Sequence, residues 1–334
     1  MGWIATPALV AASCEAGAFG FLAGAVMSPA GVKTAIAQTR SLTNKPFGVN
    51  FHMFQPGAHE IADLLIDERV RAVSFGRGSS LAMIERFKTA GIICIPTVGA
   101  LKHATKMAEL GVDMLIVQGG EGGGHTGSVA TSVLLPQVLD TVSIPVVAAG
   151  GFSDGRGLAG ALAYGACGIA MGTRFLLTEE SPVPEATIQK YLVATTDDIV
   201  VCTRIDGIPQ RMIRSPLVAR LERSGPLGMW VRAFEGALAL KRRTGAPWIE
   251  LLTNATAMAK SGETSWRATI MAAAAPALIQ KAVVDGKPEE GVMPTGQVAG
   301  RLVDVPTCRD LVAQIVADAR TRLLAVTALT SCNA

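Results

Sequence analysis

The chain has 334 residues, of which 49% are apolar and 17% are charged, and its net charge is +3. This composition is typical of a compact globular enzyme and excludes a disordered chain. The absence of a long basic run argues against a nucleic-acid partner. The chain opens without a signal peptide, and its apolar stretches are too interrupted to span a bilayer. We therefore expect a cytoplasmic protein with no membrane partner.

Short apolar or β-branched runs alternate with amphipathic segments over the first 175 residues, at a spacing of roughly 25 residues. This alternation is typical of βαβ units and a parallel sheet. The predicted strands are 19–23, 47–51, 72–75, 92–96, 114–118, 146–149 and 168–172. The predicted helices between them are 29–40, 57–68, 79–90, 100–110, 129–141 and 155–165. Gly91, Gly111 and Gly165 each follow a predicted helix, where a left-handed cap is needed.

Seven strands are one fewer than an eight-stranded barrel needs. A first helix at about 7–16 should follow a strand, but only the segment Met1–Ala5 is available for one. We interpret the α/β pattern as a (β/α)₈ TIM barrel whose first strand is truncated. The alternative is an open, doubly wound sheet, which would not need that strand.

The pattern changes after residue 175. We expect a helix at 183–196, an extended segment at 199–204, a mixed helical region at 216–265, and helices at 267–285 and 306–326. These assignments predict a TIM-barrel domain at 1–175 and 301–330, and a mostly helical insertion at 176–300 that caps the barrel mouth. The apolar helix at 268–284 fits either the core or the face of a homodimer, and we prefer the core.

A glycine-rich loop at 119–127 follows the buried run at 114–118, and six of its nine residues are glycine. Barrel enzymes keep their active sites at the carboxyl ends of strands. Glycine lets a flat or anionic ligand approach the backbone closely. His125 is the one histidine of this loop, and imidazole is suited to proton transfer near neutral pH. The loop is therefore the candidate active site.

The next two strands also end in glycine, which predicts a phosphate site. Gly150 and Gly151 follow one strand, and Gly172 and Thr173 follow the other. Backbone N–H groups and a helix N-terminus at such a place commonly bind phosphate. Residues 155–160 also match G-x-G-x-x-G, but they start too far beyond the strand for a dinucleotide fingerprint.

Other catalytic patterns are missing from the sequence. It has no nucleophile elbow, no Walker loop and no zincin motif. The six cysteines form no C-x-x-C pair, so we expect reduced thiols and no metal site.

The sequence resembles the nitronate monooxygenase (2-nitropropane dioxygenase) family and its relative, the type II flavin-dependent enoyl-acyl-carrier-protein reductase. The resemblance covers nearly the whole chain. It rests on six segments: Met1-Gly2-Trp3, Pro46-Phe47-Gly48-Val49-Asn50, the loop with His125, Ala149-Gly150-Gly151, Met171-Gly172-Thr173-Arg174-Phe175 and Gly296-Gln297-Val298-Ala299-Gly300.

This resemblance implies a TIM barrel with non-covalent FMN, hydride transfer at flavin N5, and His125 as the catalytic acid or base. The residues implied to contact the cofactor are Met1, Gly2, Trp3, Asn50, Gln118, Gly123, Gly124, Gly150, Gly151, Gly172 and Thr173. The last four of these would hold the phosphate.

Three features depart from the family pattern. Residue 122 is glycine where the family often has alanine, and Thr97 stands where some nitronate enzymes have lysine. The segment 203–209, with Arg211 and Arg214, resembles an actinobacterial subgroup associated with steroid-ring degradation. The substrates of that subgroup are coenzyme A thioesters, and basic residues suit their phosphates.

Several functions stay open at this point. Within the flavin class, the substrate is a nitronate with O₂, an enoyl thioester with NAD(P)H, or a hydroxyacyl-CoA that the flavin oxidises. The main interpretation is a nitronate monooxygenase-like oxidoreductase, and the acyl-CoA dehydrogenase or reductase is the alternative. A second class is a flavin-free barrel that binds a phosphorylated substrate, as an isomerase or aldolase would.

Overall fold

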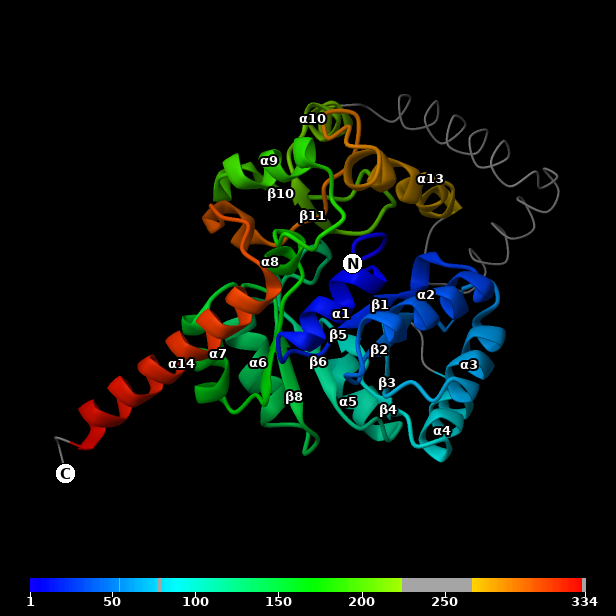
Figure 1. The fold of residues 1–334 in the computed structure, drawn as a ribbon. Coiled ribbons are helices and arrows are strands. Elements are labelled where there is room, and N and C mark those ends of the chain that lie inside the picture. Colours follow the sequence, from blue (N-terminus) through cyan, green and yellow to red (C-terminus); the bar gives the residue numbers. More distant parts are fainter. Residues whose placement is uncertain (54, 77–79, 224–265, 332–334) are drawn as a thin grey trace. The chain divides into compact units, whose positions relative to one another are not determined.

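The computed structural model describes residues 1–53, 55–76, 80–223 and 266–331 (Figure 1). The chain divides into two compact units. Unit 1 comprises Met1–Gly122, Thr126–Pro182 and Leu302–Ala334, and unit 2 comprises Gly123–His125 and Val183–Arg301. Most of the predicted mixed region at 216–265 lies outside the described residues.

Parallel strands form the centre of unit 1, in two four-stranded sheets with the orders β1-β2-β3-β4 and β5-β6-β8-β9. Their bounds are β1 Phe21–Ala23, β2 Gly48–Phe51, β3 Ala72–Phe75, β4 Ile93–Cys94, β5 Thr97–Val98, β6 Leu115–Gln118, β8 Val146–Ala149 and β9 Gly168–Ala170. The predicted strand at 92–96 corresponds to β4 and β5 together. Between these two strands lies Pro96, which has no N–H to donate to a ladder. One short segment of chain therefore serves both sheets.

The ladders of unit 1 explain why the strands are short, apolar runs. Val49, Val73 and Val117 are fully buried, because both faces of these strands are covered. Among the described residues no ladder joins β1 to β9, so backbone pairing does not close the two sheets into a ring. The α/β class with parallel strands is confirmed, and an eighth strand that closes the barrel stays a prediction.

Helices follow the strands of unit 1 as predicted. Their bounds are α1 Pro7–Glu15, α2 Pro29–Leu42, α3 Ala58–Asp67, α4 Leu81–Thr89, α5 Leu101–Glu109, α6 Thr131–Leu139, α7 Gly155–Tyr164, α8 Thr173–Leu176 and α14 Cys308–Ser331, with a 3₁₀ turn η1 at Gly24–Val26. Gly91, Gly111 and Gly165 have φ values of 73°, 76° and 101°, so the three predicted glycine caps are confirmed.

The last helix, α14, packs along α7 (Figure 1). The close approach depends on Gly155, the first residue of α7. A Cβ at this position would lie 2.5 Å from the backbone nitrogen of Ala319 and 2.6 Å from the carbonyl oxygen of Ile315. The G-x-G-x-x-G match therefore lies inside α7, and its first glycine is required by helix packing.

Unit 2 contains helices and a three-stranded antiparallel sheet in the order β10-β11-β7. The bounds are β7 Gly124–His125, α9 Glu185–Val193, η2 Thr196–Asp198, β10 Ile199–Cys202, β11 Gln210–Ile213, α10 Pro216–Arg223, α13 Trp266–Val283 and η3 Gln297–Arg301. β11 was not among the predicted strands. Ala275 and Ala282 of α13 are buried. None of the described helices has the length and apolar character that crossing a membrane requires.

Five of the six cysteines lie in the described residues, and all five are free thiols. Burial is the largest cause that raises the pKa of Cys94 to about 12, and the charge of Asp113 adds to it. Burial also raises the pKa of Cys308 to about 11. Such thiols are poor nucleophiles at neutral pH and serve packing.

The contact between α7 and α14 generates a stability prediction. Gly155→Ala should lower the free energy of unfolding by about 1–3 kcal/mol, because the new methyl group meets backbone atoms that cannot rotate away. Urea unfolding measures this change. Gly160→Ala in the same helix is the matched control, because nothing lies within 4 Å of its added Cβ. It should stabilise by about 0.5–1 kcal/mol. Equal effects of the two substitutions would contradict the packing argument.

Candidate functional site

Three strands of unit 1 end side by side, and this places their glycine loops at one edge. In the parallel ladders, Gln118 of β6 pairs with Ala149 of β8, which pairs with Ala170 of β9. The chain beyond each of these residues therefore leaves the sheet at the same level. The segments that leave there begin with 119–122, 150–151 and 171–172, so the predicted grouping of Gly150, Gly151, Gly172 and Thr173 follows from strand register.

Gly150 and Gly151 form a turn that other residues would strain. Their φ values are 88° and 86°, in the left-handed region that favours glycine. Successive N–H groups in such turns make anion-binding concavities. Gly151 and Gly172 are exposed, and no hydrogen bond of either N–H group is found among the described residues. This edge of the sheet therefore offers N–H donors to an anionic ligand.

The start of the chain lies at the same edge. A Cβ at Gly172 would lie 3.4 Å from the sulfur of Met1. Gly2 contacts Val26, since its added Cβ would be 3.0 Å from a Val26 methyl group. Trp3 has a φ of 60°, which is uncommon outside glycine. The structure thus brings Met1 to the predicted phosphate glycines and puts Trp3 in a turn of unusual backbone conformation.

Two predicted cofactor contacts are polar side chains at strand ends. The side-chain amide of Asn50 donates from Nδ2 to the backbone carbonyl oxygen of Ser74 at 3.3 Å and to the Oγ of Ser74 at 3.4 Å. Gln118 packs against Gly122, where an added Cβ would lie 2.6 Å from its Cδ. A side chain larger than that of glycine at residue 122 would therefore require the Gln118 side chain to move.

Thr131 and Glu121 hold the glycine loop to the start of α6. The Thr131 hydroxyl lies 2.8 Å from Oε2 of Glu121 and 2.9 Å from the carbonyl oxygen of Gly150, and its N–H donates to the same carboxylate at 2.9 Å. A carboxylate at a helix N-terminus is stabilised by the exposed N–H groups there. The acid of this loop therefore has a structural partner.

Arg174 follows Thr173 but has a structural role. Its side chain is 4% exposed and donates to Oδ1 of Asp304 at 2.8 Å and to the carbonyl oxygen of Leu177 at 3.0 Å. Its charge fixes α8 to the segment before α14. We therefore leave it out of the ligand site.

Gly123, Gly124 and His125 belong to unit 2. A Cβ at Gly123 would lie 2.4 Å from the carbonyl carbon of Thr295 and 2.5 Å from the nitrogen of Gly296. The predicted Gly296-Gln297-Val298-Ala299-Gly300 motif therefore packs directly on this part of the loop. Gly124 has a φ of 68° and leads into the short strand β7.

His125 lies beside a buried carboxylate. In the ladder between β7 and β11, His125 pairs with Gln210. Its Nε2 is 2.6 Å from Oδ2 of Asp206, which is also 2.6 Å from Nε2 of Gln210. The two nitrogens are 3.1 Å apart. The Asp206 side chain is 6% exposed and that of His125 is 44% exposed, so the carboxylate lies behind a ring that reaches solvent.

The hydrogen bonds keep Asp206 ionised although it is buried. Burial is the largest single influence, and by itself it would raise the pKa. The hydrogen bond and charge of His125, the N–H of Ile208 and the amide of Gln210 act together in the other direction. The net pKa of Asp206 lies below its ordinary value.

Sequence reasoning missed the roles of Asp206 and Gln210. The segment 203–209 had been singled out for its arginines and its resemblance to a subgroup. An acid before glycine, between the apolar Ile205 and Ile208, is the signal that could have pointed to a buried carboxylate. Of the predicted basic residues, Arg214 already has a partner, since its Nε donates to Glu222 at 2.8 Å.

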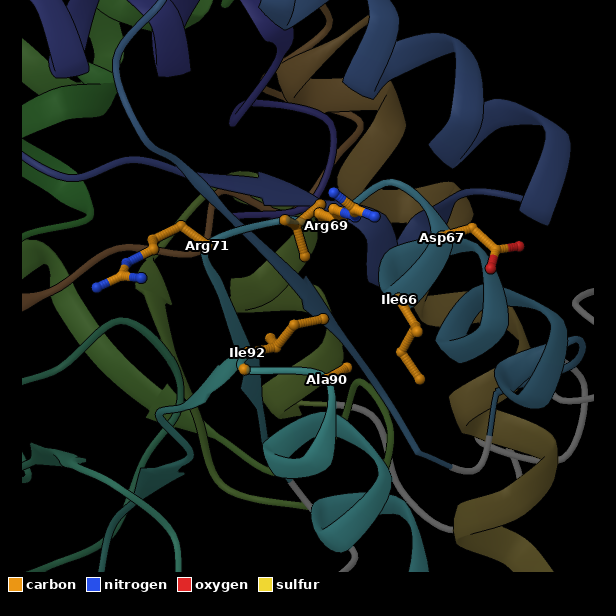
Figure 2. Close-up of a pocket in the computed structure, with 8 residues that line it drawn as sticks. Ile66, Asp67, Arg69, Arg71, Ala90 and Ile92 are labelled. Atoms are coloured by element: carbon orange, nitrogen blue, oxygen red, sulfur yellow. The ribbon is translucent and has the colours of Figure 1, made fainter.

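A cavity of about 500 Å³ in unit 1 lies away from these residues (Figure 2). Its lining comes from the end of α3 and from the segments that precede β3 and β4: Ile66, Asp67, Arg69, Val70, Arg71, Ala90, Gly91 and Ile92. These segments are at the amino ends of the strands, the face that barrels use for stability. Figure 2 shows the Asp67, Arg69 and Arg71 side chains diverging from one another. They form no converging anion site.

Comparison with known proteins identifies relatives over the whole chain. Residues 1–65 and 58–318 match the family model described as nitronate monooxygenase. A protein of Rhodococcus jostii is 50% identical over 98% of this chain and 93% of its own length. One of Mycobacterium tuberculosis is 47% identical over 98% and 94%. Both are named (3aS,4S,5R,7aS)-5-hydroxy-7a-methyl-1-oxo-octahydro-1H-indene-4-carboxyl-CoA dehydrogenase.

Two solved structures are similar over almost the same length. FabK from Thermotoga maritima has a TM-score of 0.80 at 31% identity and covers 98% of this chain and 93% of its own. The nitroalkane oxidase of Streptomyces ansochromogenes has a TM-score of 0.78 at 25% identity, with coverages of 97% and 95%.

The Thr131 contacts predict a change in loop stability. Thr131→Val keeps the shape of the side chain and removes the hydroxyl, so the free energy of unfolding should fall by about 1–3 kcal/mol. Amide hydrogen exchange at Gly119, Gly120 and Gly122, whose N–H groups are hydrogen-bonded, should become faster. The control is Thr141→Val, whose exposed hydroxyl bonds only within its own helical turn. A control as destabilised as Thr131→Val would exclude a special role for this contact.

Proposed function

Because the chain belongs to the nitronate monooxygenase family, we propose that it is an FMN-dependent dehydrogenase that oxidises a ring hydroxyl of a coenzyme A thioester. The observation that carries the dehydrogenase part of this proposal is the identity of 50% and 47%, over 98% of the chain, to two proteins named as dehydrogenases of a hydroxylated carboxyl-CoA. Those names do not state which bond is oxidised, and the ring hydroxyl is our own choice of that bond. The comparisons favour this alternative over the broader nitronate monooxygenase-like interpretation.

The residues present in unit 1 fit the phosphate of FMN. The left-handed turn at Gly150 and Gly151 and the exposed N–H of Gly172 supply donors at one sheet edge. The hydroxyl of Thr173 stands at the start of α8 and adds a further polar group. Asn50 and Gln118, at the ends of β2 and β6, are proposed to contact the ring system. When bound, FMN supplies the hydride acceptor, its N5 atom.

His125 is proposed to take the proton of the substrate hydroxyl. Oxidation of a secondary alcohol removes a hydride from carbon and a proton from oxygen, so the enzyme needs a base. The side chain of His125 is 44% exposed, and its Nε2 lies against an ionised carboxylate, which would stabilise the positive charge that the ring acquires on taking a proton. Basic side chains such as Arg211 are proposed to bind the phosphates of the thioester.

One departure from the family pattern favours the dehydrogenase over nitronate oxidation. Thr97, in β5, stands where some nitronate enzymes have lysine. A lysine would add a positive charge for an anionic nitronate, whereas a neutral alcohol requires none. The flavin-free isomerase or aldolase stays a prediction that the following titration tests.

Flavin titration tests the phosphate site. The apoprotein should bind FMN at least about tenfold more tightly than riboflavin, because only FMN offers an anion to the N–H donors. Gly151→Ala should reduce this ratio, because a Cβ at a φ of 86° strains the turn. Gly168→Ala is the control, since nothing lies within 4 Å of its added Cβ. Equal affinity for FMN and riboflavin would contradict the proposed phosphate site. Failure to bind either flavin would favour the flavin-free isomerase or aldolase.

Anaerobic mixing tests the reaction. The FMN-loaded protein should lose its oxidised flavin absorbance when mixed with the hydroxylated indane carboxyl-CoA thioester, and His125→Ala should slow this loss about 10²-fold or more while flavin stays bound. The free acid without coenzyme A should react poorly. A nitronate with O₂, and an enoyl-CoA with NAD(P)H, are run in parallel, and faster turnover of either one would overturn the dehydrogenase proposal.

A further inference from the structure

The contact between His125 and Asp206 requires a hydrogen atom between them. A carboxylate oxygen and an unprotonated ring nitrogen both carry lone pairs, which would repel at the observed 2.6 Å. Because Asp206 is ionised and the Gln210 amide, 3.1 Å from Nε2, already donates to Oδ2, we assign the hydrogen to Nε2 of His125, which donates it to Oδ2. In a neutral imidazole only one nitrogen is protonated, so the lone pair is then on Nδ1. The geometry thus selects one of the two tautomers.

The Asp206 carboxylate is itself held in place from two sides. Its Oδ1 accepts the backbone N–H of Ile208 at 3.1 Å, and its Oδ2 accepts the amide of Gln210 at 2.6 Å. Gln210 is 2% exposed and is fixed by strand pairing opposite His125. A buried polar group without partners is costly, and here each carboxylate oxygen has a donor. The carboxylate therefore has little freedom to move away from the ring.

We infer that Asp206 is a positioning residue for His125: it fixes the ring in the tautomer with hydrogen on Nε2 and stabilises the charged imidazolium that forms when Nδ1 takes the substrate proton. Gln210 completes the arrangement by orienting the carboxylate. The catalytic part of this inference rests on the proposed function. The proton passes from the substrate oxygen to Nδ1, and Asp206 remains ionised throughout, as the acid of a catalytic triad does.

The tautomer is measured first, without any substrate. The protein has four histidines, so selective ¹⁵N-histidine labelling gives few signals, and His125→Ala assigns the one that matters. In alkaline buffer, where imidazole is neutral, the wild-type His125 spectrum should show hydrogen on Nε2 alone. In Asp206→Asn the His125 spectrum should show either a mixture of the two tautomers or hydrogen on Nδ1. This substitution retains an oxygen that can accept the Ile208 N–H.

The kinetic consequence is measured on the FMN-loaded protein. Asp206→Asn should lower the rate of flavin reduction at saturating substrate about 10²-fold or more, with little change in substrate affinity. Asp206→Glu should recover part of the rate, because it restores a carboxylate. Combining Asp206→Asn with His125→Ala should cost no more than His125→Ala alone, because Asp206 acts only through the ring. Asp197→Asn, which removes an exposed charge from the same unit, should leave the rate unchanged.

Each outcome bears on a separate claim. Wild-type hydrogen on Nδ1, or an unchanged tautomer in Asp206→Asn, overturns the positioning role whatever the substrate. Independent, additive losses in the double variant also overturn it, because they assign Asp206 a role apart from His125. A wild type with the expected tautomer that fails to oxidise the thioester overturns the proposed function instead and leaves the His125–Asp206 pair standing. If Asp206→Asn does not fold, the wild-type spectrum and the Asp206→Glu variant still decide whether Asp206 positions His125.

Discussion

The register of three parallel strands is the constraint on which the ligand edge of unit 1 depends. Because β6, β8 and β9 pair without stagger at Gln118, Ala149 and Ala170, the chain leaves all three strands at one level. A Cβ at Gly150 would lie 3.0 Å from the carbonyl oxygen of Gly119 and 3.1 Å from the nitrogen of Gly122. Glycine is thus required at residue 150 by this close approach and by its φ of 88°, and at residue 151 by its φ of 86°.

A second constraint governs unit 2, where a carboxylate is buried. Removing Asp206 from water would favour its neutral form, and hydrogen bonds from His125, Ile208 and Gln210 reverse that preference. The donors come from two strands and a turn, so the sheet must form before they converge. Folding of β7 against β11 and ionisation of Asp206 are therefore coupled. A partly satisfied network of this kind would cost more than an apolar core.

Much of unit 1 is predictable from sequence, because its signals are local. Buried strands appear as short apolar runs, and the cap glycines at 91, 111 and 165 mark helix ends within a few residues of the strands that follow. The grouping of Gly150, Gly151 and Gly172 also follows, since parallel strands bring their carboxyl ends together.

Unit 2 is less accessible to sequence reasoning for a physical reason. β7 has only two residues, and its partner β11 is more than 80 residues further along the chain. Such a short pairing leaves no periodic pattern, so the contact of His125 with Asp206 was invisible. Gln210 has the same difficulty, because a buried amide looks like a surface residue until its partners are known.

Nitronates and alcohols differ in whether the substrate must lose a proton during oxidation, and this difference bears on the role of the His125–Asp206 pair. A nitronate is already an anion and has lost its acidic proton before it meets the enzyme. A secondary alcohol becomes a ketone only when it loses both the hydride on its carbon and the proton on its hydroxyl oxygen. A lone, half-exposed imidazole can accept that proton, but the imidazolium that results is stabilised when a carboxylate lies behind it. A fixed, ionised Asp206 is of direct use to the proposed alcohol oxidation, as it would be to any reaction in which the substrate loses a proton. The pair that the sheet of unit 2 assembles thus supplies the base that the proposed alcohol oxidation requires.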